Sequence, residues 1–192
     1  MEIIKKTKEI KQLLYKIKKR KLKKIDWIVV HGTGDPEGSK ENRTLRYVLS
    51  EDGLCTVSRG KILFHYFINK KGEIFQFLQL DEWACHSNLG RGDKRTIGIE
   101  LENISVSKEI KEINDNYFTS EQYSSLDFLI QKLDEELKIK YCSTHDYCRY
   151  LAKKPPKHCA GKNFNFFSYC SPDYPNIQFF EWDYQKNVIT KY

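Results

Sequence analysis

Several apolar runs along the chain have the length and residue types of β-strands. Residues 26–31 place Trp-Ile-Val-Val between an aspartate and a histidine, which is typical of a central strand. Residues 62–68 and 73–77 are rich in β-branched and aromatic side chains, and the turn residues at 69–72 between them predict a hairpin. Residues 96–102, with the sequence Thr-Ile-Gly-Ile-Glu-Leu-Glu, are expected to form another strand.

Two longer segments repeat their apolar residues about one helical turn apart. Thr119 and Gln122 have the spacing of a capping box, and the apolar stripe behind them predicts the main helix, which runs to about Lys138. Residues 1–25 carry a lysine or arginine at nearly every second position and predict a basic amphipathic helix. A shorter helix is expected at residues 42–50. The stripes are Tyr123, Leu126, Leu129, Ile130, Leu133 and Leu137 in the main helix, and Ile3, Ile10, Leu13, Leu14 and Ile17 in the basic one.

The order of these elements is helix, strand, helix, hairpin, strand and long helix, followed by a loop-rich C-terminal third. This order predicts an α/β fold in which helices flank a mixed central β-sheet. A chain of 192 residues fits one domain and is long enough to bury a substantial core. We expect that domain at residues 26–170, with the basic helix before it at residues 1–25 and a C-terminal extension, residues 171–192, packing on it.

Positive charge is concentrated in the basic helix. The whole chain has a formal net charge of +7 and a pI of about 9.0. The plainer interpretation is a solvated helix that packs its apolar stripe on the domain. The alternative is an electrostatic anchor for a polyanion such as a cell-wall polymer or anionic lipid. The helix lacks the aromatic interleaving and motifs of nucleic-acid-binding proteins, so we expect no nucleic-acid partner.

Targeting signals and cysteines bear on the compartment. No run approaches the roughly 18 apolar residues of a membrane span, and no uninterrupted apolar stretch follows the basic N-terminus as in a secretory signal peptide. We therefore expect no membrane span and synthesis in the cytoplasm, so that action on a cell wall would need release or export by another route. We expect mostly reduced, buried thiols among the six cysteines, Cys55, Cys85, Cys142, Cys148, Cys159 and Cys170.

Candidate metal ligands lie at the end of the first strand and in the C-terminal third. His31 ends its strand, where it is held rigidly while its ring faces a loop-lined cleft. His145 and the neighbours His158 and Cys159 supply further candidates. Two imidazoles and a thiolate would bind zinc and leave a fourth position for water, as a catalytic site requires. Taken singly, His31 has the plainer interpretation of a buried core histidine, and Cys159 that of a small buried apolar residue.

Six short segments occur along the chain in a characteristic order. They are W-I-V-V-H-G-T at 27–33, F-H-Y-F-I at 64–68 with K-G-E-I-F-Q at 71–76, W-A-C-H at 83–86, T-I-G-I-E-L-E-N at 96–103, H-D at 145–146 and K-H-C-A-G-K-N-F at 157–164. Together they resemble the zinc-dependent N-acetylmuramoyl-L-alanine amidase family, which includes phage endolysins of the lysozyme type, muropeptide-recycling amidases and animal peptidoglycan-recognition proteins. The resemblance covers roughly residues 26–168 and implies a single amidase domain.

The resemblance implies that zinc is the cofactor and that His31, His145 and Cys159 bind it. The last segment departs from the family pattern, because Ala160 stands where the family usually has proline. The gap between His145 and Cys159 is also somewhat long. His158 is a rival ligand, although the register of the following glycine favours Cys159.

The resemblance also implies roles for residues around the metal. Lys157 matches the family lysine that stabilises the oxyanion. Lysozyme-type members have an acid–base tyrosine where this chain has Phe64, which cannot transfer a proton, whereas the recycling type has a glutamate that matches Glu100. Glu100 is therefore the expected acid–base residue. His65 and His86 match histidines that line the family's cleft and are expected to contact substrate, with a hydrogen-bonded strand histidine as an equal alternative for His65.

The implied reaction is hydrolysis of the amide between the lactyl group of N-acetylmuramic acid and L-Ala of the stem peptide. Peptidoglycan or muropeptides would be the partners, and we expect a monomer. The basic N-terminal segment favours a lytic, endolysin-like enzyme, while a cytoplasmic muropeptide-recycling amidase is the alternative because Glu100 matches that branch. A non-catalytic peptidoglycan-binding receptor is a further alternative. Such relatives typically lack the cysteine ligand, which this chain retains.

Overall fold

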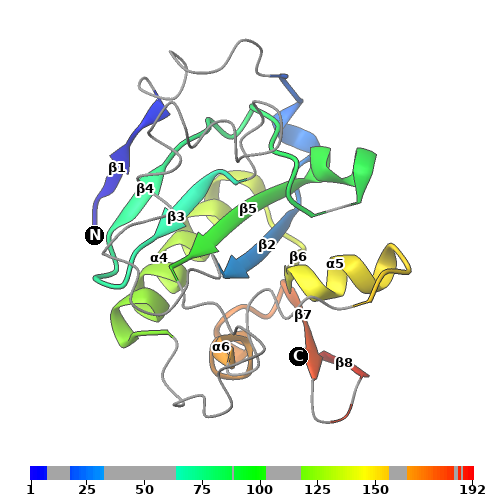
Figure 1. Ribbon diagram of the computed structural model, residues 1–192. Helices are drawn as coiled ribbons and strands as arrows, with labels where there is room; N and C mark the ends of the chain where they lie inside the picture. Colours follow the sequence, from blue (N-terminus) through cyan, green and yellow to red (C-terminus); the bar gives the residue numbers. More distant parts are fainter. Residues whose placement is uncertain are drawn as a thin grey trace, which may run out of the picture.

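A mixed eight-stranded sheet forms the centre of the computed structural model, which describes residues 1–7, 18–32, 64–87, 89–102, 118–155, 164–183, 186 and 188–192. The strand order is β1-β4-β3-β5-β2-β6-β7-β8 (Figure 1). The predicted α/β fold, with helices flanking a mixed sheet, is confirmed. The strands are β1 (Ile3–Lys5), β2 (Trp27–Gly32), β3 (Tyr66–Ile68), β4 (Ile74–Gln76), β5 (Thr96–Leu101), β6 (Tyr141–Thr144), β7 (Gln178–Asp183) and β8 (Val188–Lys191). The helices are α4 (Ser120–Leu137), α5 (His145–Leu151) and α6 (Phe166–Cys170), with 3-10 turns η1 (Leu22–Lys24), η2 (Gly90–Arg95) and η3 (Ser171–Asp173).

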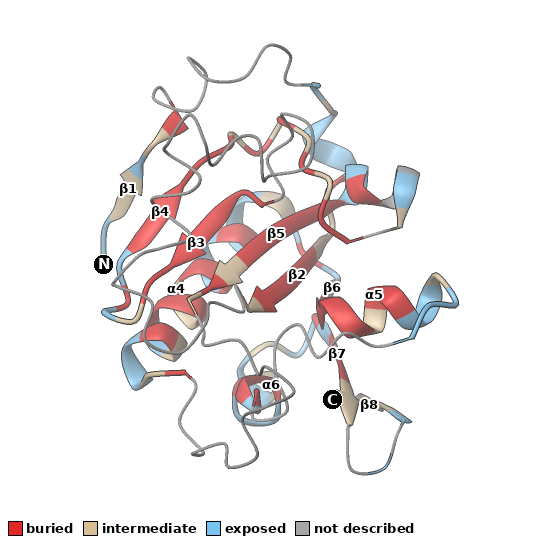
Figure 2. Ribbon diagram, viewed as in Figure 1, coloured by how far each residue is buried: buried red, intermediate tan, exposed pale blue. Residues whose placement is uncertain are grey.

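Strands β2, β5 and β6 form the parallel centre of the sheet. Figure 2 shows this centre as mostly buried, whereas the edge strands β1 and β8 are partly exposed. His31 near the end of β2 pairs with Glu100 of β5, and the preceding Val30 pairs with Thr144 of β6. Since parallel strands bring their carboxyl ends to one edge, this edge collects the residues that end all three strands.

The two faces of β5 differ in chemistry because successive side chains of a strand point to opposite faces. Thr96, Gly98 and Glu100 lie on one face. The intervening isoleucines and Leu101 lie on the other, where α4 covers them (Figure 1). The helix α4 begins at the predicted capping box, in which Thr119 and Gln122 each bond to the other's backbone N–H. The buried core on this side includes Ile97, Ile99, Leu101, Leu126, Leu129, Ile130 and Leu133.

The opposite face carries α5. The ring of Tyr147 in α5 stacks on Phe180 of β7, with centroids 4.5 Å apart and planes 4° from parallel. It also lies 5.9 Å from the ring of Trp27. Trp27 and His31 are four residues apart on β2 and therefore share a face. The first residue of α5, His145, is thus held on the face that His31 occupies.

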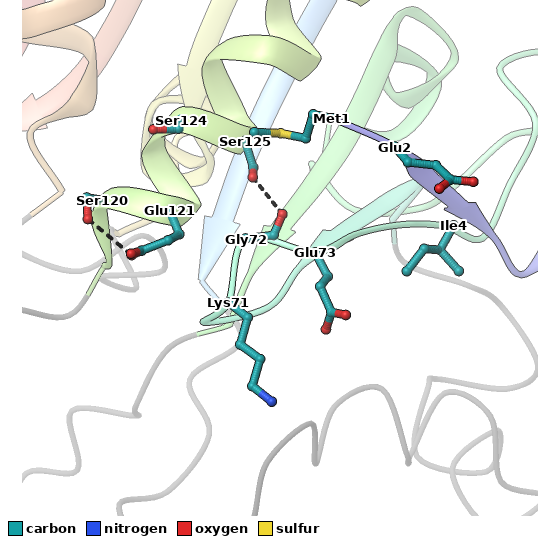
Figure 3. Close-up of a pocket in the computed structure, with 10 residues that line it drawn as sticks. All are labelled: Met1, Glu2, Ile4, Lys71, Gly72, Glu73, Ser120, Glu121, Ser124 and Ser125. Carbon is teal, nitrogen blue, oxygen red and sulfur yellow. Dashed lines mark hydrogen bonds between the residues drawn. The ribbon is translucent and has the colours of Figure 1, made fainter.

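The predicted hairpin is confirmed, since β3 and β4 pair antiparallel through the turn at residues 69–72. Gly72 in this turn has a φ of +77°, and a Cβ there would lie 2.7 Å from the carbonyl oxygen of Glu121. The hydroxyl of Ser125 donates to the Gly72 carbonyl at 2.6 Å (Figure 3). A hollow of about 490 Å³ lies between this turn, the start of α4 and β1, and it is not lined by any predicted site residue in the part of the chain that the structure describes.

The N-terminal segment differs from the predicted basic helix at both described ends. Residues Ile3–Lys5 form β1, which pairs in parallel with β4, and η1 is a single 3-10 turn. Lys19 makes an isolated antiparallel bridge with Glu82. The edge of β4 offers backbone hydrogen-bond partners to Ile3 and Ile4. Forming the first turn of an isolated helix is unfavourable, so pairing with β4 stabilises a strand here instead. Residues 8–17, which hold most of the predicted apolar stripe, lie outside the described residues.

The C-terminal extension continues the sheet. β7 pairs in parallel with β6, and β8 returns antiparallel to β7. The expectation of a loop-rich C-terminal third is therefore wrong for these strands, whereas the helix expected at residues 42–50 lies outside the described residues. The described cysteines Cys142, Cys148 and Cys170 are buried free thiols, as predicted, and Cys85 is half-buried. Among the described helices, none has the length and apolar content needed to span a membrane.

Candidate active site

Two imidazoles meet at the carboxyl edge of the central strands. His31 belongs to β2 and His145 is the first residue of α5, directly after β6. Their ring centroids are 4.6 Å apart with planes at 48°, and both side chains are buried. The register explains the meeting, because Val30 and Thr144 are paired and each is followed by one of the histidines. The structure therefore brings two of the three predicted zinc ligands together.

The chemistry of this pair fits a zinc site. Zinc binds neutral imidazole, and burial together with the neighbouring His145 and His86 lowers the pKa of His31 well below its ordinary value. Within the described ranges, no group of three or more His, Cys, Asp or Glu side chains is placed to hold a metal ion. The predicted third ligand, Cys159, its rival His158 and the predicted oxyanion residue Lys157 all lie outside those ranges.

Glu100 stands next to His31. The two residues are direct partners in the parallel pairing of β5 with β2, so their side chains leave the same face of the sheet. Glu100 is half-buried, whereas its neighbours Ile99 and Leu101 are fully buried on the α4 side. The predicted acid–base carboxylate and the first predicted metal ligand are thus neighbours at one edge.

The aromatic residues near Glu100 are poor candidates for acid–base work. Phe64 is buried against Phe67 and Phe77, with ring centroids 6.5 and 5.5 Å away. Tyr66 is the tyrosine nearest to Phe64 in the sequence. It pairs with Ile99 and belongs to the core beneath α4. It therefore lies on the face opposite Glu100, and its hydroxyl points away from the predicted cleft.

His86 lies against β5 with both ring nitrogens close to protein groups. Its Nδ1 is 3.0 Å from Nε2 of His31, and its Nε2 is 2.8 Å from the hydroxyl oxygen of Thr96. A Cβ on Gly98 would lie 2.8 Å from Cγ of His86, so the glycine is what allows the ring to lie this close to the strand. The side chain is only 6% exposed. This placement does not give His86 the substrate-facing surface that the sequence led us to expect.

His65 is fully buried. Its Nδ1 accepts a hydrogen bond from the backbone N–H of Gly98 at 3.1 Å, and its Nε2 lies 3.0 Å from the carbonyl oxygen of Glu82. Burial, followed by the nearby charge of Arg20, lowers its pKa well below the ordinary value. The placement fits the alternative of a hydrogen-bonded histidine within the sheet rather than a substrate contact.

Arg20 is a residue whose role the sequence did not reveal. Its guanidinium donates to the carbonyl oxygens of Leu80, Asp93 and Thr96 at 2.9, 3.1 and 2.5 Å. Burial lowers its pKa to about 10, which leaves it charged at neutral pH. Arg20 is the only arginine among the lysines of residues 1–25, and that is the one signal the sequence offered. It ties the N-terminal segment to the strand that carries Glu100.

Solved structures with the same fold include an amidase, an endolysin and a protein named PGRP-SA. The N-acetylmuramoyl-L-alanine amidase LysC from Clostridium intestinale has 20% identity and a TM-score of 0.60, and the match covers 92% of this chain and 99% of that one. A bacteriophage endolysin from Thermus scotoductus has 13% identity and a TM-score of 0.58, over 83% and 92% of the two chains. The bumblebee protein PGRP-SA has 11% identity and a TM-score of 0.61, over 84% and 90%.

Comparison of the sequence with known families shows more than the shared fold does. No curated protein matches the chain significantly. The profile of a family described as N-acetylmuramoyl-L-alanine amidase, Amidase_2, matches residues 21–162, which is most of the chain and includes every predicted site residue. The chain therefore belongs to the N-acetylmuramoyl-L-alanine amidase family, and the enzyme class expected from its motifs is confirmed.

Proposed function

We propose that the chain is a zinc-dependent amidase that cleaves the bond between N-acetylmuramic acid and L-Ala of peptidoglycan. The observation that carries this proposal is the meeting of His31, His145 and Glu100 at one edge of the sheet, in a chain of the amidase family. His31 and His145 would hold the metal, with Cys159 as the third ligand. Two imidazoles and one thiolate leave a net positive centre, which suits a Lewis acid.

The proposed reaction assigns separate tasks to the metal, a carboxylate and a lysine. A zinc ion in this site supplies a Lewis acid that polarises the amide carbonyl and lowers the pKa of water. The Glu100 carboxylate accepts a proton from the attacking water as the water oxygen bonds to the carbonyl carbon of the amide. The same proton then passes to the leaving amine of L-Ala as the C–N bond breaks. The Lys157 ammonium stabilises the negative charge that develops on the carbonyl oxygen.

A lytic role on the polymer is the proposed biological setting. The positive charge of the chain favours contact with an anionic wall. Two of the structural neighbours described above carry names that fit wall lysis, an endolysin and an amidase. Recycling of soluble muropeptides is the alternative within the enzyme class. The likeness to PGRP-SA supports a third candidate, a receptor that binds peptidoglycan without cleaving it.

Removal and return of zinc tests the metal dependence of the proposed reaction. After dialysis against a chelator, the protein should release no L-Ala amino groups from purified peptidoglycan. One equivalent of zinc per chain should restore the release, because zinc is expected to act from a single site. Circular dichroism before and after dialysis controls for unfolding. Full activity in folded protein shown to be free of metal would overturn the proposal.

A further inference from the structure

We infer that a directional chain of hydrogen bonds, Asp93–Thr96–His86–His31, fixes the tautomer of His31 and makes Thr96 and His86 positioning residues for the metal site. The inference rests on the proposed function, because it concerns how that site is prepared. The hydroxyl oxygen of Thr96 lies 3.1 Å from the Asp93 carbonyl oxygen and 2.8 Å from Nε2 of His86. Nδ1 of His86 then lies 3.0 Å from Nε2 of His31.

The direction of these hydrogen bonds follows from the first acceptor, the Asp93 carbonyl oxygen. A carbonyl oxygen only accepts, so the Thr96 hydroxyl donates its proton to Asp93. The Thr96 oxygen is then an acceptor for Nε2–H of His86. Both His31 and His86 are buried, which favours the neutral imidazole with one N–H. Nδ1 of His86 must therefore accept, and Nε2–H of His31 is the group that donates to it.

This direction decides which nitrogen of His31 has a lone pair. With its proton on Nε2, His31 keeps Nδ1 unprotonated, and an unprotonated ring nitrogen is what a metal ion binds. Nδ1 is thus the nitrogen that would face zinc. Neighbours that fix the tautomer and orientation of a ligating histidine typically change metal affinity by about 10- to 100-fold when they are removed.

Two neighbouring residues, Gly98 and Arg20, hold this series of hydrogen bonds in place. Gly98 leaves room for the His86 ring directly against β5. Arg20 donates from Nη1 to the carbonyl oxygens of both Asp93 and Thr96, at 3.1 and 2.5 Å, and so fixes the end of the chain that sets its direction. The described part of the N-terminal segment is therefore linked to the predicted metal site through the hydrogen bonds of Arg20.

Nitrogen NMR of histidine-labelled protein tests the inference without measuring turnover. In metal-free protein we expect both His31 and His86 in the form with the proton on Nε2. In zinc-loaded protein we expect His31 to keep that proton and to bind zinc through Nδ1. Thr96→Val removes the hydroxyl with little change in shape. It should give a mixture of His31 tautomers and weaken zinc binding, measured by competition with a chelator, at least tenfold.

Two further variants separate positioning from general damage. Thr96→Ser retains the hydroxyl and should restore both the single tautomer and the zinc affinity. Thr190→Val makes the same change on β8, far along the sheet order from β5, and should alter neither. A wild-type His31 with its proton on Nδ1 would overturn the inference even if Thr96→Val fails to fold. Unchanged tautomers and zinc affinity in folded Thr96→Val would overturn it as well.

The outcomes for this inference and for the proposed function can be told apart. A protein that shows the expected tautomers and binds zinc, yet cleaves no amide, would keep the chain of hydrogen bonds and refute the proposed function. A protein that cleaves the amide with His31 bound to zinc through Nε2 would do the reverse.

Discussion

His31 and Glu100 are direct partners across the parallel pairing of β2 and β5, so an imidazole and a carboxylate leave the same face of the sheet side by side. Neither residue is near the other in the sequence. Their pairing places a predicted metal ligand and a predicted proton acceptor within one small region before any loop contributes to the site.

The carboxylate is the first target for mutation. Glu100→Gln keeps the shape of the side chain but removes its capacity to accept a proton. We expect zinc content to stay at one per chain while turnover falls by roughly 10²-fold or more. Amide hydrolysis and metal analysis on the same preparation check this. Turnover at the wild-type level would remove Glu100 from the mechanism.

The third ligand can be identified by metal content. Cys159→Ala should lose stoichiometric zinc, because only two imidazoles would remain, whereas His158→Ala should retain it. Metal analysis after gel filtration distinguishes the two. The opposite pattern, with zinc lost only from His158→Ala, would show that the neighbouring residue is the ligand.

Two glycines should respond differently to the same substitution. In Gly98→Ala the new Cβ would lie 2.8 Å from the His86 ring, so we expect zinc affinity to fall at least tenfold and stability by about 1–3 kcal/mol. Gly72→Ala also destabilises, because the residue has a φ of +77° and its Cβ would meet Glu121, but it should leave zinc affinity unchanged. Equal zinc affinity in both folded variants would contradict the role given to Gly98.

Glu181 makes the stability of the β7–β8 hairpin depend on pH. Burial, with a smaller effect of Asp183, raises the pKa of this carboxyl to about 8, although a hydrogen bond from Tyr192 opposes the rise. Between an unfolded value near 4.5 and this native value, the folded protein holds a proton that the unfolded chain has lost. Stability contributed by the neutral carboxyl is therefore lost as pH rises through that window.

Glu181→Gln should remove this dependence. The variant should gain thermal stability relative to the wild-type protein at pH 8.5 compared with pH 5, as measured by the midpoint of unfolding at both values. If the difference between the two proteins were the same at both pH values, the carboxyl would not be protonated in the folded state.

The exposed lysines before β2 offer a test of wall attraction that keeps the fold intact. Removing the whole N-terminal segment would also delete β1 and Arg20, so substitution is the cleaner experiment. Replacing Lys21, Lys23 and Lys24 with glutamine should weaken binding to sacculi at low salt, since exposed charges are screened at higher salt. Hydrolysis of a small soluble muropeptide should stay the same. Unchanged binding at low salt would exclude these lysines as an anchor.

Local signals in the sequence predicted the elements that position the site. The apolar run before His31 has the composition of a buried strand, and the capping box at Thr119 specifies where α4 begins. The turn residues between β3 and β4 specify a hairpin. Each of these features depends on residues close together in the chain, which is why pattern and spacing were sufficient.

Features that depend on distant partners were not predictable in the same way. Ile3 has the spacing of a helical stripe, yet it lies in a strand because β4 offers an open edge. Arg20 differs little from its lysine neighbours in sequence, and only the fold brings three carbonyl oxygens to it. Likewise, the polar partners of His86 become apparent only when β2 and β5 are paired.

Mass spectrometry of the products from purified peptidoglycan, with soluble anhydro-muropeptides digested alongside, tests the proposed activity most directly. We predict stem peptides with a free amino group on L-Ala and glycan strands whose lactyl carboxyl groups are free. Faster release from the polymer than from the soluble substrate would support the lytic role. Products in which the peptide is still joined to N-acetylmuramic acid, or no new L-Ala amino terminus from either substrate, would contradict the amidase reaction proposed for His31, His145, Cys159 and Glu100.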